Sequence, residues 1–112
     1  MSSRPPVDPN DAVDAMIAAA PKYAKAKAER VYLEEFRKSK KAILMQGCSQ
    51  LPIGAQEREA YAHPEYIGLL AALQVAVEAE EALRWKMVAA QARIEVWRST
   101  EASNRNQDRA MR

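Results

Sequence analysis

The sequence predicts an all-α fold: a long antiparallel helical hairpin, similar to a coiled coil, behind a short N-terminal helix. Three observations carry this prediction. Alanine is in excess at 22 of 112 residues while glycine occurs three times, a balance that favours long helices over sheets. Residues 22–46 contain neither glycine nor proline, and apolar residues recur four and three apart between Leu69 and Trp97. Such spacing is the heptad pattern of packed helices.

The first helix is expected over residues 9–20, after a flexible lead over residues 1–7. Asp8 is a suitable N-cap, and Pro9 fits the first position of a helix. Pro21 cannot donate a backbone hydrogen bond and restrains the residue before it. The chain is therefore expected either to kink at Pro21 or to stop and restart there, and the short helix is either collinear with the next helix or folded back.

The second helix is expected over residues 22–46, with Gly47 ending it in a left-handed conformation. At 100° per residue it has two different sides. Its apolar side contains Ala28, Tyr32, Phe36, Ser39 and Ile43, with Ala24, Val31 and Ala42 at the edges. Its basic side contains Lys27, Arg30, Arg37, Lys38 and Lys41.

Two further helices are expected over residues 55–62 and 64–103, separated by the His63–Pro64 step. Residues 104–112 form a polar tail, so that residues 8–103 make up one helical domain. The longest helix has one apolar seam, which includes Ala76, Glu80 and Ala90 besides Leu69, Leu73, Leu83, Met87, Ile94 and Trp97. The carboxylate of Glu80 in this seam requires either a basic partner from residues 22–46 or local exposure.

A second apolar face lies about 200° around the same helix from the seam. It contains Ile67, Trp85, Ala89, Ala92 and Val96. Because one hairpin cannot cover both faces, this pattern predicts a homo-oligomer, most simply a dimer that forms a bundle of four or more helices. The alternative is a monomer in which the N-terminal helix folds over Trp85.

Charge is distributed unevenly along the chain. Residues 22–46 hold eight basic and three acidic side chains, whereas residues 55–101 hold five basic and eight acidic. Opposite signs on neighbouring helices favour the hairpin. The basic side therefore has three interpretations: a solvated surface partly neutralised by Glu78, Glu80 and Glu81, a stripe that follows phosphates, or a face that docks on an acidic partner. Aromatic residues do not interleave with this stripe, so the sequence does not suggest base stacking.

The composition argues against an enzyme. One histidine, one cysteine and three scattered glycines offer no catalytic triad, no metal site and no phosphate-binding loop, so we expect no cofactor and no small-molecule substrate. No apolar run approaches the roughly 18–20 residues that span a bilayer, and no signal peptide is recognisable. With a lone cysteine, Cys48, these features predict a cytoplasmic protein that has no membrane partner.

Three segments resemble small helical proteins of tailed phages and prophages. They are YLEEFRKSKKA at residues 32–42, AYAHPEY at 60–66 and RWKMVAAQARIEVWRS at 84–99. Such proteins are often encoded among early genes for recombination or replication. The resemblance implies a non-enzymatic accessory or adaptor protein that acts through protein–protein contacts, with non-specific DNA contact by the basic side. The alternative hypothesis is an inhibitor or regulator that binds a host protein without touching DNA.

Overall fold

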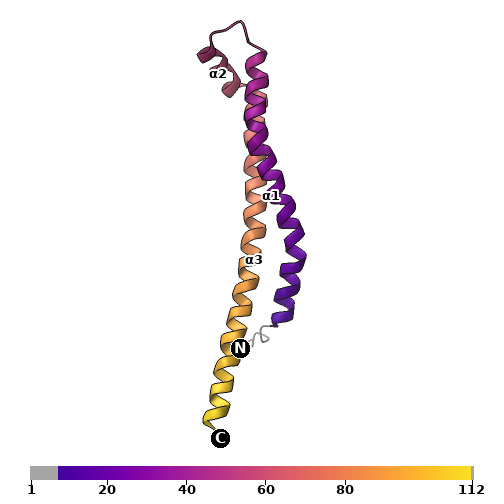
Figure 1. The fold of residues 1–112 in the computed structure, drawn as a ribbon, viewed down its shortest axis with the longest axis vertical. Helices are drawn as coiled ribbons and strands as arrows, with labels where there is room; N and C mark the ends of the chain where they lie inside the picture. Colours follow the sequence, from indigo (N-terminus) through magenta and orange to yellow (C-terminus); the bar gives the residue numbers. More distant parts are fainter. Residues whose placement is uncertain (1–7, 112) are drawn as a thin grey trace, which may run out of the picture. The chain divides into compact units, whose positions relative to one another are not determined.

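The computed structural model describes residues 8–111, and the regular secondary structure in this range is entirely α-helical. The helices are α1 (Pro9–Gln46), α2 (Ile53–Ala62) and α3 (Pro64–Ala110), as labelled in Figure 1. The protein is thus an all-α helical hairpin of two long helices, with a short helix between them. The flexible lead expected over residues 1–7 lies outside the described residues, as does Arg112.

In the N-terminal part of the chain, α1 runs through Pro21 without interruption, which is the collinear one of the two expected arrangements, but the expected boundary between residues 20 and 22 is absent. The expected separate helix over 9–20 is therefore the first part of α1. Asp8 caps it, since its Oδ1 accepts a hydrogen bond from the Asn10 backbone N–H at 2.8 Å. An interior proline costs a helix about 3 kcal/mol. Good helix formers surround Pro21, and Ala19 is buried beside it, so packing and propensity outweigh the missing hydrogen bond.

The C-terminal part also differs, because α3 continues to Ala110 and includes most of the expected polar tail. Residues 104–110 contain neither glycine nor proline. Arg109 lies in the last turn, where a positive charge interacts favourably with the helix dipole. Residues 104–110 are therefore helical although their polar side chains remain exposed to solvent.

The turn between α1 and α2 corrects another expectation. No residue in the range 8–111 has a positive φ angle, so Gly47 does not end α1 in the left-handed conformation. Its N–H instead donates to the carbonyls of Ile43 and Leu44 at 3.3 and 3.2 Å, which tightens the last turn of α1. The side chain of Gln56 then donates to the carbonyl of Leu51 at 2.7 Å and ties the turn to α2.

The helices pack as two compact units. One consists of residues 24–81, here called the 24–81 unit. The other, here called the terminal unit, combines the two ends of the chain and is described over residues 8–23 and 82–111.

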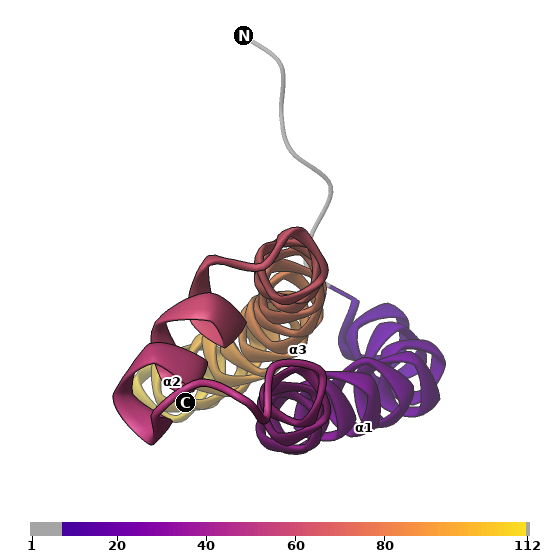
Figure 2. The same cartoon turned by 90° about the horizontal axis from the view of Figure 1, so that it is seen from above.

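In the 24–81 unit, α1 and α3 run antiparallel. Arg30 pairs with Glu80, and Lys40 pairs with Glu65 at 2.9 Å, so residues later in α1 meet residues earlier in α3. The short helix α2 lies beside the end of α1 and the start of α3, as Figures 1 and 2 both show. Ala60 of α2 is buried with 1% of its surface exposed, and its small side chain permits this close approach.

The seam predicted on α3 is the least exposed side of that helix. Ala76, Glu80 and Ala90 are buried, Leu69, Leu73, Leu83, Met87 and Ile94 are half-buried, and Trp97 is 37% exposed. The terminal unit packs through small residues, because Ala12 and Ala19 of α1 and Ala90 of α3 are its buried side chains. Each of these methyl groups removes little apolar surface from water.

The side of α1 that faces inward was predicted wrongly. In the 24–81 unit, Tyr32 and Ile43 from the expected apolar side are 64% and 53% exposed. Residues of the basic side, including Arg30, Arg37 and Lys41, are half-buried. Long basic side chains cover apolar surface with their methylene groups while their charged ends reach carboxylates across the hairpin. Phe36 stacks on Tyr32 with ring centroids 5.8 Å apart, which protects part of the exposed side.

Candidate functional site

A cleft of about 480 Å³ in the 24–81 unit is the strongest candidate for a binding site. All three helices contribute to it, and it is lined by Arg37, Lys38 and Lys41 of α1, Tyr61 of α2 and Tyr66 of α3. We call it the basic cleft. Three cations within five residues of one helix create a positive potential that favours an anionic ligand.

Lys41 is fixed at the wall of the basic cleft. Its Nζ lies 3.6 Å from Oε1 of Glu57 and 4.7 Å from the centre of the Tyr61 ring. Hydrogen bonding with the Tyr61 side chain is the main cause that raises the pKa of Lys41 above its ordinary value, and the charge of Glu57 adds to it. Lys41 therefore keeps its positive charge throughout the physiological pH range.

Two tyrosines form the aromatic part of the cleft. The rings of Tyr61 and Tyr66 meet edge to face, with centroids 5.3 Å apart and planes at 77°. Tyr66 is buried, but Tyr61 is 48% exposed. Tyr61 thus presents an accessible ring that Tyr66 and Lys41 hold in place.

Arg37 and Lys38 are the two cations of the cleft whose positive charge is not neutralised, or only weakly neutralised, by carboxylates of the described residues. Arg37 is half-buried, and within residues 8–111 no carboxylate forms an ion pair with it. Lys38 lies 3.4 Å from Glu35, but both side chains are about 70% exposed, so water screens this pair strongly. A half-buried guanidinium without an acidic partner is well suited to bind a carboxylate or a phosphate from outside.

The structure separates the other two basic residues of the predicted stripe from the cleft. Arg30 is bound inside the chain: its Nε and Nη2 both donate to the Glu80 carboxylate, the latter at 3.0 Å, and its Nη1 donates to Glu34 at 3.0 Å. These bonds, with Glu80 first, raise the pKa of Arg30. Glu80 therefore has the basic partner that was one of its two expected outcomes. Lys27 is exposed and does not line the cleft.

Aromatic residues do not interleave with the basic stripe along α1, but packing brings Tyr61 of α2 and Tyr66 of α3 to the end of the stripe at Lys41. Tyr61 and Tyr66 were missed because they are distant from Lys41 in sequence and reach it only through the packing of α2. The sequence feature that could have indicated this proximity is the helix break at His63–Pro64. Tyr61 and Tyr66 lie on either side of this break, where the chain changes direction next to the end of α1.

The second predicted face, on α3, is open to solvent. Trp85 and Val96 are 58% and 56% exposed, and Ala89 and Ala92 are exposed as well. The guanidinium of Arg84 lies 4.6 Å from the centre of the Trp85 ring. The four exposed residues Trp85, Ala89, Ala92 and Val96 belong to the terminal unit. Ile67, which is 54% exposed, belongs to the 24–81 unit. We call Trp85, Val88, Ala89, Ala92 and Val96 the Trp85 face.

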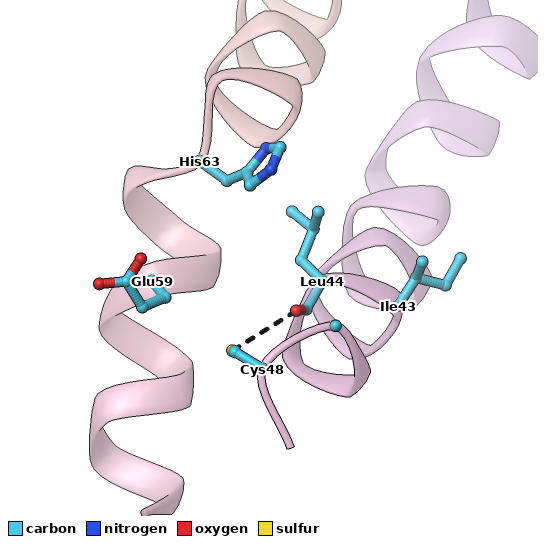
Figure 3. A pocket seen from close by; sticks show the side chains of 6 residues that line it. Ile43, Leu44, Cys48, Glu59 and His63 are labelled. Carbon is cyan, nitrogen blue, oxygen red and sulfur yellow. Dashed lines mark hydrogen bonds between the residues drawn. The ribbon is translucent and has the colours of Figure 1, made fainter. Parts of the chain in front are cut away.

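A smaller cavity, of about 190 Å³, lies beside the turn after α1 and includes Cys48 and His63 (Figure 3). The Cys48 thiol lies 3.6 Å from the backbone carbonyls of Leu44 and Met45. Nδ1 of His63 accepts the backbone N–H of Glu65 at 3.0 Å. Both side chains thus contact the backbone at helix ends, which is a structural role. Within residues 8–111, no cluster of three histidine, cysteine or carboxylate side chains is arranged to hold a metal ion.

No family model, no curated protein and no solved structure matches the chain. Within the described residues, none of the three helices is both long enough and apolar enough to span a bilayer.

Proposed function

We propose that the protein is a non-enzymatic accessory or adaptor protein of DNA recombination or replication, which acts in the cytoplasm and contacts nucleic acid through the basic cleft. The observation that carries this proposal is Arg37, a half-buried guanidinium that no carboxylate within residues 8–111 neutralises. Phosphate is the anion that nucleic acids supply in a regular array. The resemblance of the helical segments to phage proteins supports the assignment to DNA metabolism.

A salt-titrated binding assay tests the nucleic-acid contact. If the cleft neutralises two phosphates, affinity for a duplex oligonucleotide falls by about 12-fold between 50 and 200 mM salt. Replacement of Arg37, Lys38 and Lys41 by glutamate abolishes this binding. The matched control replaces Lys22, Lys25 and Lys27, three exposed lysines of α1, and produces the same change in net charge.

The control variant retains affinity within about threefold, and circular dichroism verifies that both variants keep their helices. Equal losses in the two variants would mean that total charge, and not the cleft, governs binding. If the wild-type chain shows no binding even at low salt, nucleic acid is not the ligand, and the alternative of a regulator that docks on an acidic host protein takes its place.

The same proposal includes a homo-oligomer, most simply a dimer, formed through the Trp85 face. Within residues 8–111 the buried apolar side chains are five alanines and Tyr66, so the chain alone covers few large hydrophobic groups. Trp85, Val88 and Val96 are each more than 40% exposed. Ala89 and Ala92 leave room for another helix backbone, as Ala12, Ala19 and Ala90 do inside the terminal unit. A second copy presents the same face and covers both at once.

Sedimentation tests the oligomer. Trp85→Glu produces a helical monomer, because a charge in the centre of an apolar contact must be desolvated. Gln91→Glu is the control, since Gln91 is exposed on the same helix and outside this face and the charge change is identical. A wild-type chain that sediments as a monomer at concentrations of about 100 μM would refute the dimer.

A further inference from the structure

The basic side chains of α1 do not form a continuous line. Arg30 is bound to Glu80, which is only 6% exposed, and to Glu34. Arg30 is the only basic residue between Lys27 and Arg37. At 1.5 Å per residue, about 15 Å of α1 therefore separates Lys27 from the first cation of the cleft. A protein that follows the backbone of a duplex needs cations distributed along its surface, and α1 does not offer them.

The cations that remain are concentrated. From Arg37 to Lys41 the helix rises about 6 Å, which corresponds to about two phosphates of one nucleic-acid strand at 3.4 Å each. The cleft is therefore a focal site, matched to one or two adjacent phosphates and not to a long stretch of backbone.

The exposed ring of Tyr61 lies at the same site, within cation–π distance of Lys41. Its orientation is set before any ligand arrives, because the Tyr61 and Tyr66 rings meet edge to face and Lys41 lies over the Tyr61 ring. A base inside a duplex is covered by its neighbours on both faces and must be unstacked to reach such a ring. A single strand presents its bases without this cost, and base stacking on aromatic side chains tolerates any sequence.

We propose that the basic cleft binds single-stranded nucleic acid, with one or two adjacent phosphates against Arg37, Lys38 and Lys41 and one base stacked on Tyr61. This inference rests on the proposed function and specifies its ligand. It predicts weak sequence preference, since a phosphate charge and the face of a base are features that every nucleotide presents.

Fluorescence anisotropy with the full chain tests the inference, using a labelled 12-nucleotide thymine strand and a 12-base-pair duplex at 50 mM salt. The strand binds at least tenfold more tightly than the duplex. Tyr61→Leu weakens binding of the strand about tenfold, a loss typical of one stacked base. The same substitution leaves the affinity for the duplex unchanged. Tyr61→Trp keeps or improves affinity. Tyr32→Leu is the control, because Tyr32 is 64% exposed on α1 and does not line the cleft.

The outcomes separate this inference from the proposed function. Absence of binding to both nucleic acids overturns both. Equal affinity for strand and duplex, or a Tyr61→Leu variant that binds the strand as the wild type does, overturns the inference and leaves the proposed nucleic-acid contact standing. Inorganic polyphosphate that competes as well as the strand at equal phosphate concentration also overturns it, because the cleft would then read charge alone.

Discussion

Replacement of Arg30 by methionine tests the central ion pair of the hairpin. The substitution keeps most of the methylene surface and removes the guanidinium, so that the carboxylate of Glu80 loses the two hydrogen bonds that Arg30 donates to it. Glu80 is 6% exposed, and both of its oxygens accept bonds from Arg30. Loss of one partner from a buried pair costs about 3–5 kcal/mol. Water reaches the edge of this pair, because the Arg30 side chain is 22% exposed, so we expect a loss at the lower end, about 3 kcal/mol.

Urea denaturation followed by circular dichroism at a fixed protein concentration measures this loss. The double variant Arg30→Met/Glu80→Leu recovers stability to within about 1 kcal/mol of the wild type, because an apolar pair leaves no buried charge uncompensated. Lys38→Met is the control, since the Lys38–Glu35 pair is exposed, and it produces no measurable loss.

The single variant also acquires a characteristic pH dependence. A buried carboxylate that loses the hydrogen bonds of a guanidinium has its folded-state pKa raised by burial. Its penalty is therefore complete at neutral pH and decreases as the pH falls through the raised pKa, because the folded state then binds a proton more readily. A single variant as stable as the wild type at pH 7, or a double variant no more stable than the single one, would refute this account of Glu80.

Three further predictions concern packing and charge. Ala90→Leu inserts a large side chain where Ala90 is 5% exposed and destabilises the terminal unit by about 1–3 kcal/mol, whereas Ala102→Leu, at an exposed position of α3 outside the Trp85 face, does not; equal melting curves would contradict the close approach of the helices. Pro21→Ala restores a backbone donor inside α1 and raises the free energy of unfolding, by up to about 3 kcal/mol, and lower stability would contradict a continuous helix. Lys40 lowers the pKa of Glu65 through its hydrogen bond and charge, so this pair contributes stability above the unfolded pKa of Glu65 and loses it as the pH falls through the lowered value. Lys40→Gln therefore flattens the acid limb of the stability curve, and an unchanged limb would show that the pair is not formed.

The hairpin was predictable because its signals are local. The four-and-three spacing of α3 depends only on which residues face the seam, and the break at His63–Pro64 depends on the covalent geometry of proline. Glu80 was recognisable as an anomaly for the same reason, since a carboxylate in an apolar seam needs a partner wherever it lies. The length of α1 was less predictable, because Pro21 removes one backbone hydrogen bond. The packing that compensates for this loss involves residues distant in the sequence and cannot be deduced from the neighbours of Pro21.

The inward side of α1 and the basic cleft could not be read from α1 alone. Hydrophobic periodicity places Tyr32 and Ile43 inside, yet the carboxylates of α2 and α3 attract the opposite side. Glu57, Glu65 and Glu80 each bind a cation of α1. These three glutamates lie in α2 and α3, beyond the turn that follows α1. The hydrophobic pattern of α1 alone therefore contains no information about them.

Arg30 and Arg37 show why one basic residue became structural and the other remained available. They are seven residues apart and lie on nearly the same side of α1. In the antiparallel register that the Arg30–Glu80 pair sets, one heptad forward on α1 corresponds to one heptad back on α3, so the counterpart of Arg37 is Leu73. A carboxylate there would neutralise Arg37 as Glu80 neutralises Arg30. Because leucine occupies that position, Arg37 has no carboxylate partner within residues 8–111, and its guanidinium lines the cleft together with Tyr61 and Lys41.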